Sequence, residues 1–249
     1  MSLLPLLTII FLMMLNATPQ ADSTAIHTPL EERFYAASKA LTILIDKLTE
    51  MNAAPITIPL QYFKVLDQEN QERVTLTVET ILTTTFELIR EGYSPLNTKL
   101  LVTRFMNNMG LSALSDVFLT YKDGDLIDMY NNQNQMIFAS LNLFALSAYN
   151  IEELLCRPWT ELWHRDSHII QQLMEKTLDV LFSDEKKTMY MSIPVHQVVE
   201  LTSAKKNTAW VHCKIFSPIM SSEGRTAGFL AINELRSKVW SASNRIIQD

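Results

Sequence analysis

Residues 126–166 read LIDMYNNQNQMIFASLNLFALSAYNIEELLCRPWTELWHRD, and this stretch decides the fold of the second half of the chain. Two short apolar runs, Leu126–Tyr130 and Met136–Ser140, lie on either side of five Asn and Gln residues. Short β-rich runs around a polar turn predict a β-hairpin. The residues that follow, 141–162, favour short helices. The stretch therefore predicts two strands and then several helical turns.

A longer helix and three further strands are predicted after this stretch. The apolar spacing over Ser167–Phe182 is that of an amphipathic helix, and Asp166 is placed to accept the unpaired N–H groups of its first turn. Residues 221–224 form a turn between the last two strands. The three strands are Met189–Leu201, Thr208–Pro218 and Thr226–Glu234.

The middle strand alternates between two faces, which is typical of a sheet that is covered on one side. The two sets are Val211, Cys213 and Ile215 on one face, and Trp210, His212 and Lys214 on the other.

Upstream of the hairpin, residues 25–122 predict a helical lobe. Thr28 and Glu31 form a capping box with Pro29 at the first helical position, and the apolar period continues to about residue 50. A second period runs from Val74 and stops at Gly92. Shorter helices are expected over 97–109 and 111–121.

Both ends of the chain carry further apolar patterns. Residues 3–15 form an apolar run of the length of a secretory h-region, so residues 1–24 are either a signal peptide or a membrane-associating or packed segment. At the other end, Leu235, Val239, Ala242 and Ile246 recur at helical spacing. Residues 236–249 are therefore expected to form an exit helix.

Composition excludes several classes of protein. The chain has 249 residues, a net charge of −6 and no clustered basic stripe, so we expect no direct nucleic-acid binding. Its two cysteines, Cys156 and Cys213, suit neither a disulfide framework nor a zinc site. Phosphate-loop, nucleophile-elbow and metalloprotease motifs are absent from the sequence, which indicates a protein that is not an enzyme.

Residues 125–235 resemble a PAS domain in the order of their elements. The most specific piece is Tyr149–Leu155, YNIEELL, which is similar to the "GYS.EELLG" segment of that family. The resemblance implies an α+β fold, with a five-stranded antiparallel sheet and short helices on one face. It also implies a sensory or regulatory module that binds a small ligand or a protein partner, in signal transduction or transcriptional regulation.

The resemblance also allows cofactors to be considered residue by residue. Flavin-binding light sensors of the family carry a reactive Cys in "GRNCRFLQ", where this chain has Trp159, and Cys156 takes the place of the motif's Gly. A flavin photoadduct is therefore not expected. His168, near the start of the long helix, is the residue that a heme would use as its axial ligand. His164 fits the His-Pro-Asp-like turn of cofactor-free members, so we expect no cofactor.

Aromatic side chains and one cysteine are the candidates for a ligand pocket or a partner surface. Trp210 is the candidate for the outer sheet face, because an exposed aromatic there suits a protein partner. A partner protein, or a second copy of the chain, would use this face and the exit helix. The full set is Phe138, Phe144, Tyr149, Trp159, Trp163, Trp210 and Cys213.

Two other functions stay open at this point. A secreted or periplasmic ligand-binding protein would make residues 1–24 a cleaved signal, whereas a regulator of the PAS type would be cytoplasmic or nuclear. A cofactor-free scaffold or dimerisation module would have a filled core. A pocket that holds a ligand distinguishes a sensor from such a scaffold.

Overall fold

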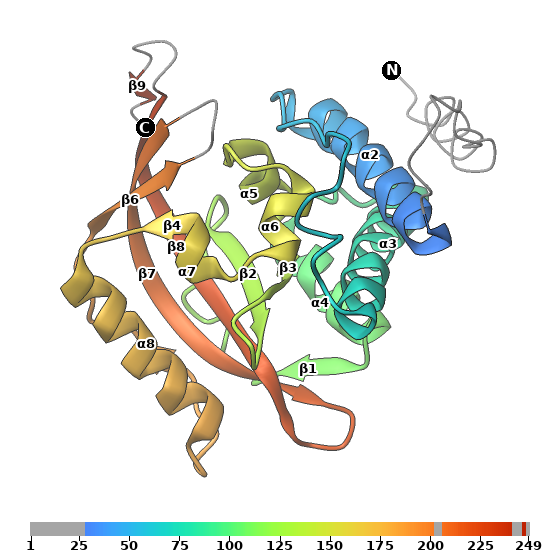
Figure 1. Ribbon diagram of the computed structural model, residues 1–249. Helices are drawn as coiled ribbons and strands as arrows, with labels where there is room; N and C mark the ends of the chain where they lie inside the picture. The colour runs from blue at the N-terminus through green and yellow to red at the C-terminus, as the bar shows by residue number, and fades with distance from the viewer. Residues whose placement is uncertain (1–27, 202–205, 241–245, 248–249) are drawn as a thin grey trace.

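The computed structural model describes residues 28–201, 206–240 and 246–247, which form a helical lobe and a strongly curved antiparallel sheet (Figure 1). The predicted signal or anchor, residues 1–24, lies outside these residues. Among the described helices, none has an apolar stretch long enough to cross a membrane.

The lobe consists of helices α2 (Pro29–Thr49), α3 (Gln68–Arg90) and α4 (Thr98–Asn108), close to the predicted bounds. The capping box is confirmed: Glu31 N–H donates to Thr28 Oγ1, and Thr28 N–H donates to Glu31 Oε2. The apolar stripes of the three helices face one another and form the core of the lobe. Its fully buried members include Phe34, Leu41, Leu44, Val74, Val78, Ile81, Leu101 and Phe105.

The helix expected over 111–121 is wrong. Gly110 ends α4 with a φ of 65°, a conformation that favours glycine, and the chain then enters strand β1 (Leu111–Ala113). β1 pairs with Ile219–Ser221, at the far end of a long strand, where an open edge offers backbone partners. Residues 114–121 form turns. Tertiary pairing therefore overrides the local helical spacing.

The second half of the chain confirms the predicted α+β fold and its element order. The main strands are β2 (Leu126–Asn131), β3 (Met136–Ala139), β6 (His196–Leu201), β7 (Lys206–Ser221) and β8 (Thr226–Trp240). They pair in the order β3-β2-β8-β7-β6, and every pairing is antiparallel.

The described sheet has nine strands where five were predicted, because short strands extend its edges. β5 (Met189–Tyr190) and β6 divide the predicted strand 189–201, and Pro194 between them has no N–H to donate to a ladder. The other additions are β1, β4 (Trp163–His164) and β9 (Ile246–Ile247).

The predicted exit helix, residues 236–249, is also wrong in its described part. β8 continues to Trp240 and pairs with the start of β7 through Asn207↔Trp240 and Trp210↔Ser237. β9 pairs with β8 in turn. Apolar residues that recur every three to four positions do not distinguish a helix from a strand in so short a segment. β7 supplies the pairing partner that makes this segment a strand.

Four helices cover one face of the sheet, which we call the inner face. They are α5 (Leu141–Leu146), α6 (Ile151–Cys156), α7 (Trp159–Leu162) and α8 (Ser167–Phe182). Asp166 precedes α8 as predicted, but its side chain makes no cap; its backbone carbonyl accepts from Ile169 and Ile170 instead. Figure 1 shows the lobe and α8 separated by the sheet.

The lobe covers the opposite, outer face. Phe105 of α4 packs against Phe138 of β3 with ring centroids 4.9 Å apart. The outer-face side chains of the neighbouring strands, including Ile127, Met129 and Ile232, are fully buried. The chain therefore supplies its own cover for this part of the sheet.

A β-bulge at Lys214 corrects the predicted alternation of β7. Val211 and Cys213 lie on the inner face as expected, but the register shifts between Cys213 and Ile215. Phe216 then takes the inner face and Ile215 pairs with Ile232 on the outer face. The extra residue in β7 reverses the faces beyond it.

Candidate functional site

A cavity of about 90 Å³ lies between the inner face of the sheet and its short helices. One water needs roughly 10–15 Å³ of such space, so there is room for several waters or a small organic molecule. Most of the lining is apolar. The apolar lining residues include Leu126, Leu143, Leu146, Leu173, Val198, Ala209, Val211 and Ala231.

Aromatic rings form one wall of the cavity. Tyr130 of β2 stacks on Phe229 of β8 with centroids 5.0 Å apart, and Phe216 of β7 lies 5.2 Å from Phe229. The pairing Tyr130↔Phe229 brings the first two rings together across the strands. Cross-strand aromatic pairs of this kind stabilise the sheet.

Asp128 is a buried carboxylate in the cavity lining. Its oxygens accept hydrogen bonds from the Tyr130 hydroxyl and from Asn233 Nδ2, the latter at 2.7 Å. Burial raises the pKa of Asp128 to about 6, although both hydrogen bonds and the charge of Arg165 act in the opposite direction. The group therefore gains and loses its proton near pH 6.

Arg165, just before α8, is the cation of the cavity. Its Nε donates to His196 Nε2 at 3.2 Å, and one terminal nitrogen donates to the Trp163 carbonyl at 3.2 Å. Its guanidinium carbon lies 5.6 Å from the centre of the Trp159 ring. The guanidinium is thus held on three sides, and burial lowers its pKa.

His196 is a neutral acceptor in this arrangement. Its Nδ1 lies 3.0 Å from the Pro194 carbonyl, which places the proton on Nδ1 and leaves Nε2 to accept from Arg165. Burial, together with the charge of Arg165, lowers the pKa of His196. The histidine therefore fixes the direction of the arginine without neutralising it.

Arg165 has no carboxylate within 4 Å in the described part of the chain, and Asp128 is too far away for an ion pair. A guanidinium carries five N–H groups, of which two are used here. The described residues offer no acceptor to the other three. Because Arg165 is partly buried, an acidic partner would stabilise its charge.

Glu200 of β6 forms a second polar group in the lining. It accepts from the Ser147 hydroxyl and the Ala148 N–H at 3.0 Å each, and from Asn207 Nδ2 at 3.2 Å. Ser147 and Ala148 follow α5 directly. Glu200 therefore ties the sheet to the segment between α5 and α6.

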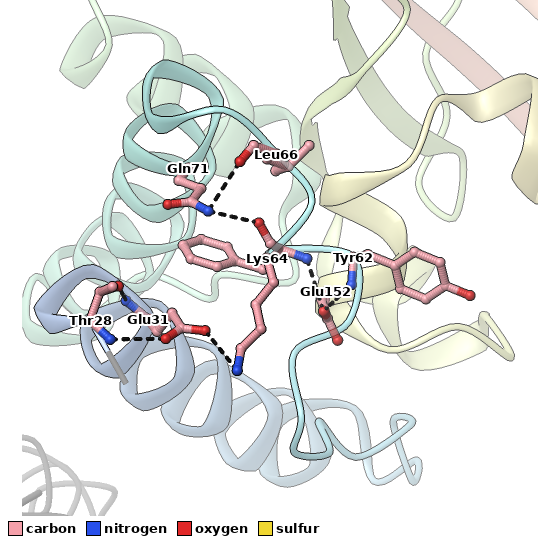
Figure 2. Close-up of polar contacts among 8 residues, drawn as sticks. Thr28, Glu31, Tyr62, Lys64, Leu66, Gln71 and Glu152 are labelled. Carbon is pink, nitrogen blue, oxygen red and sulfur yellow. Dashed lines mark hydrogen bonds and ion pairs between the residues drawn. The ribbon is translucent and has the colours of Figure 1, made fainter. Parts of the chain in front are cut away.

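The same segment continues to the lobe. Glu152 of α6 is buried, and its Oε1 accepts from the backbone N–H groups of Tyr62 at 2.8 Å and Phe63 at 3.0 Å (Figure 2). Burial raises the pKa of Glu152. Because both donors belong to the loop between α2 and α3, this one carboxylate fastens the lobe to the cavity helices.

Further contacts hold that loop in place. Gln71 of α3 donates to the carbonyls of Phe63 and Leu66 at 3.1 Å each, and Lys64 reaches Glu31 of α2 at 3.3 Å (Figure 2). The loop is therefore bonded on one side to both long helices of the lobe and on the other side to α6.

Three of the residues predicted for a pocket or partner surface line the cavity: Trp159, Trp163 and Cys213. Tyr149 is buried, and its hydroxyl donates to the Leu162 carbonyl at 2.7 Å. Phe144 is buried in the same core, outside the cavity lining. The remaining two lie elsewhere.

Phe138 and Trp210 are on the outer face. Phe138 is buried under α4, whereas Trp210 keeps 43% of its surface exposed at the end that the lobe leaves uncovered. His168 is exposed on α8 and does not line the cavity, so it is not placed to ligate a heme there.

The two cysteines are buried. Burial raises the pKa of Cys213 to about 11 and that of Cys156 well above its usual value, so neither is a reactive thiolate. Within the described residues, no cluster of three or more His, Cys, Asp or Glu side chains is arranged to hold a metal ion.

Sequence reasoning missed the polar residues of the cavity. Asp128 interrupts the apolar run of β2, and Arg165 stands at the Pro position of the His-Pro-Asp-like turn, so each left a signal. Asn233 and Glu200 left none, because their roles depend on strand register. The missed lining residues are Asp128, Arg165, Glu200 and Asn233, and the missed partner of Arg165 is His196.

No protein-family model and no curated protein matches this sequence. Among solved structures, the chain is similar to the PAS domain of a protein from Colwellia psychrerythraea, at 17% identity over 45% of this chain and 85% of that chain, with a TM-score of 0.33. It is also similar to a sensory box sensor histidine kinase from Vibrio cholerae, at 12% identity over 55% of this chain and 91% of that chain, with a TM-score of 0.31.

The second half of the chain has a PAS-like fold. Its element order and antiparallel strand pairing are those that the sequence predicts for this fold.

Proposed function

We propose that this protein is a non-enzymatic sensory module of signal transduction, in which a small molecule binds the inner-face cavity and changes how the helical lobe packs. A cavity with a mostly apolar lining and a few convergent polar groups is the usual form of a ligand site. The PAS-like order of elements supports the sensory class.

One short segment, residues 141–156, both lines the cavity and binds the lobe, and this is the main support for the proposal. Leu143, Leu146 and Ser147 line the cavity, and Glu152 bonds the lobe. α2 also contacts α5 and α6 directly. A ligand that moves α5 or Ser147 therefore acts on the residues that hold the lobe.

The ligand would work by shifting a population between two packings. It can do so only by as much as its affinity differs between them, and a shift from 1:99 to 99:1 requires roughly a 10⁴-fold difference. The lobe is then the output of the module, and Glu152 with the 60–66 loop is the contact that changes.

Native mass spectrometry of the full chain, purified from its own host, tests the ligand. We expect a bound small molecule on the wild type and none on Ala231→Leu or Ala209→Leu, whose added side chains would fill the cavity. Ala37→Leu, which enlarges a residue of the lobe core, is the control and should retain the ligand. A wild-type protein with no bound mass, and with no thermal shift from any compound of a metabolite library, would refute the proposal.

Hydrogen exchange tests the link to the lobe. The amides of Tyr62 and Phe63 donate to Glu152, so their exchange should change when the ligand is removed by dialysis. The amides of residues 177–182, at the end of α8 beyond the cavity residue Leu173 and without a bond to the lobe loop, serve as the internal reference. Equal exchange of these two amides with and without ligand would show that the protein binds a ligand but does not transmit binding to the lobe.

A protein partner is a second candidate function, favoured by the exposure of Trp210. This side chain stands on the outer face beside His212, Glu234 and Arg236, beyond the area that the lobe covers. An exposed aromatic among charged residues suits an interface core with a polar rim. If a second copy of the chain binds here, Trp210→Ser should convert a dimer into a monomer in size-exclusion chromatography with light scattering.

A further inference from the structure

We infer that the ligand of the cavity is a small carboxylate with an apolar body, and that Arg165 binds its carboxylate group. The inference rests on the proposed function, because it names the chemical class of the ligand for the same cavity. It depends on which polar groups of the lining already have partners and which do not.

Arg165 is the charged group of the lining with unused donors. His196 accepts from Nε, the Trp163 carbonyl accepts from one terminal nitrogen, and Trp159 supports the face of the guanidinium. Three N–H groups are left without an acceptor among the described residues. A carboxylate matches a guanidinium in charge and in its two parallel acceptors.

The acidic groups of the lining have already found donors. Asp128 accepts from Tyr130 and Asn233, one bond on each oxygen. Glu200 accepts from Ser147, Ala148 and Asn207. A cationic ligand would have to compete with these bonds, whereas an anionic ligand finds an arginine already in position.

The rest of the lining determines that the ligand has an apolar body. Leu143, Leu173, Val198 and Val211 offer no hydrogen-bonding side chain, and the aromatic wall of Tyr130, Phe216 and Phe229 closes one side. A hydrocarbon chain or ring fits such a lining, and the volume of about 90 Å³ keeps it short. Hydrophobic contact and one charged group together define the class.

Isothermal titration calorimetry on the full wild-type chain, after removal of any bound molecule, tests the preference for a carboxylate directly. The probes are straight-chain carboxylates from two to eight carbons, each with the alcohol and the amine of the same length. We expect the best carboxylate to bind at least about tenfold more tightly than its alcohol, as one charge-assisted hydrogen-bond pair provides, and the amine to bind most weakly.

Variants of the arginine then locate the effect. Arg165→Met keeps an unbranched side chain and removes the guanidinium charge, so this variant should bind carboxylate and alcohol equally. Arg165→Lys keeps the charge and should retain a preference for the carboxylate. Arg157→Met is the matched control, because Arg157 stacks on Tyr62 and Tyr149 and does not line the cavity; its preference should equal that of the wild type.

The outcomes separate the inference from the proposed function. An alcohol or amine that binds the wild type as tightly as the carboxylate would overturn the inference and leave the cavity a ligand site. A carboxylate preference that survives in Arg165→Met would overturn the role of the arginine. If no probe binds, the carboxylate class is excluded, and native mass spectrometry of the protein from its host decides whether the cavity holds any ligand. The wild-type series needs no variant, so the test of the carboxylate class does not depend on whether Arg165→Met folds.

Discussion

The two faces of the sheet are covered by the same chain in different ways. On the outer face, α4 packs directly on the sheet, and Ile127, Met129 and Phe138 have no exposed surface. On the inner face, α5, α7 and α8 leave a cavity, and a charged arginine beside it lacks an acidic partner. Side chains that pack closely against one another indicate a structural contact. A cavity beside a charge that has no acidic partner indicates a site for a bound molecule.

The largest effect is expected where the outer face is filled. Phe105→Ala removes a fully buried ring that packs on Phe138, and should lower the free energy of unfolding by about 3–5 kcal/mol in urea titrations. Trp210→Ala, on the uncovered part of the same face, is the control and should cost less than about 1 kcal/mol. Equal losses would mean that the lobe is not seated on the sheet as described.

A pH-dependent effect is expected on the inner face. The pKa of Asp128 is about 6 in the folded chain, above the ordinary value of 3.8, so the folded state binds the proton more tightly. The stability of the wild type should therefore fall relative to Asp128→Asn as the pH rises from about 4 to about 6, by up to about 3 kcal/mol. Urea titrations of both proteins across this range would measure it. A stability difference that stays constant with pH would show that folding does not raise the pKa of Asp128.

An intermediate effect on stability is expected at the contact between the lobe, which covers the outer face, and α6, which covers the inner face. Glu152→Ala leaves the buried N–H groups of Tyr62 and Phe63 without an acceptor, at a cost of about 1–3 kcal/mol. The two amides should exchange faster, while those of α8 keep their rates. Glu175→Ala, at an exposed position of α8, should change stability by less than about 0.5 kcal/mol. Unchanged exchange at Tyr62 and Phe63 would remove Glu152 as the link.

The smallest effect on stability is expected from filling the cavity. Ala231→Leu adds three carbons where there is space, so the free energy of unfolding should change by no more than about 1 kcal/mol. Ala37→Leu adds the same atoms to the filled core of the lobe and should cost about 1–3 kcal/mol. Thermal or urea unfolding of the two variants would compare them. A larger loss for Ala231→Leu would mean that the inner face is as full as the lobe.

Local patterns predicted the fold well wherever they were strong. The capping box at Thr28, the stop at Gly92 and the hairpin at 131–135 each depend on a few neighbouring residues, and all three agree with the structure. The exit helix was wrong because residues 236–240 are weakly patterned and take their structure from β7. Pairing partners distant in the sequence cannot be deduced from spacing alone.

The site was harder to predict than the fold. Trp159, Trp163 and Cys213 were found because aromatic and small apolar residues are common in such cavities. Asp128 and Asn233 meet only through the register of β2 with β8, and the bulge at Lys214 decides that Phe216 faces inward. A single residue inserted in one strand therefore determines which side chains line the cavity.

The difference between the two faces can be measured most directly with dissolved xenon, which binds apolar cavities whatever their natural ligand. Methyl-labelled full chain would be studied by nuclear magnetic resonance under xenon pressure. We expect shifts for the inner-face methyl groups of Leu143, Val198 and Val211, with those of the outer-face Ile127, Ile215 and Ile232 unchanged. Shifts on both faces, or none on the inner face, would contradict it.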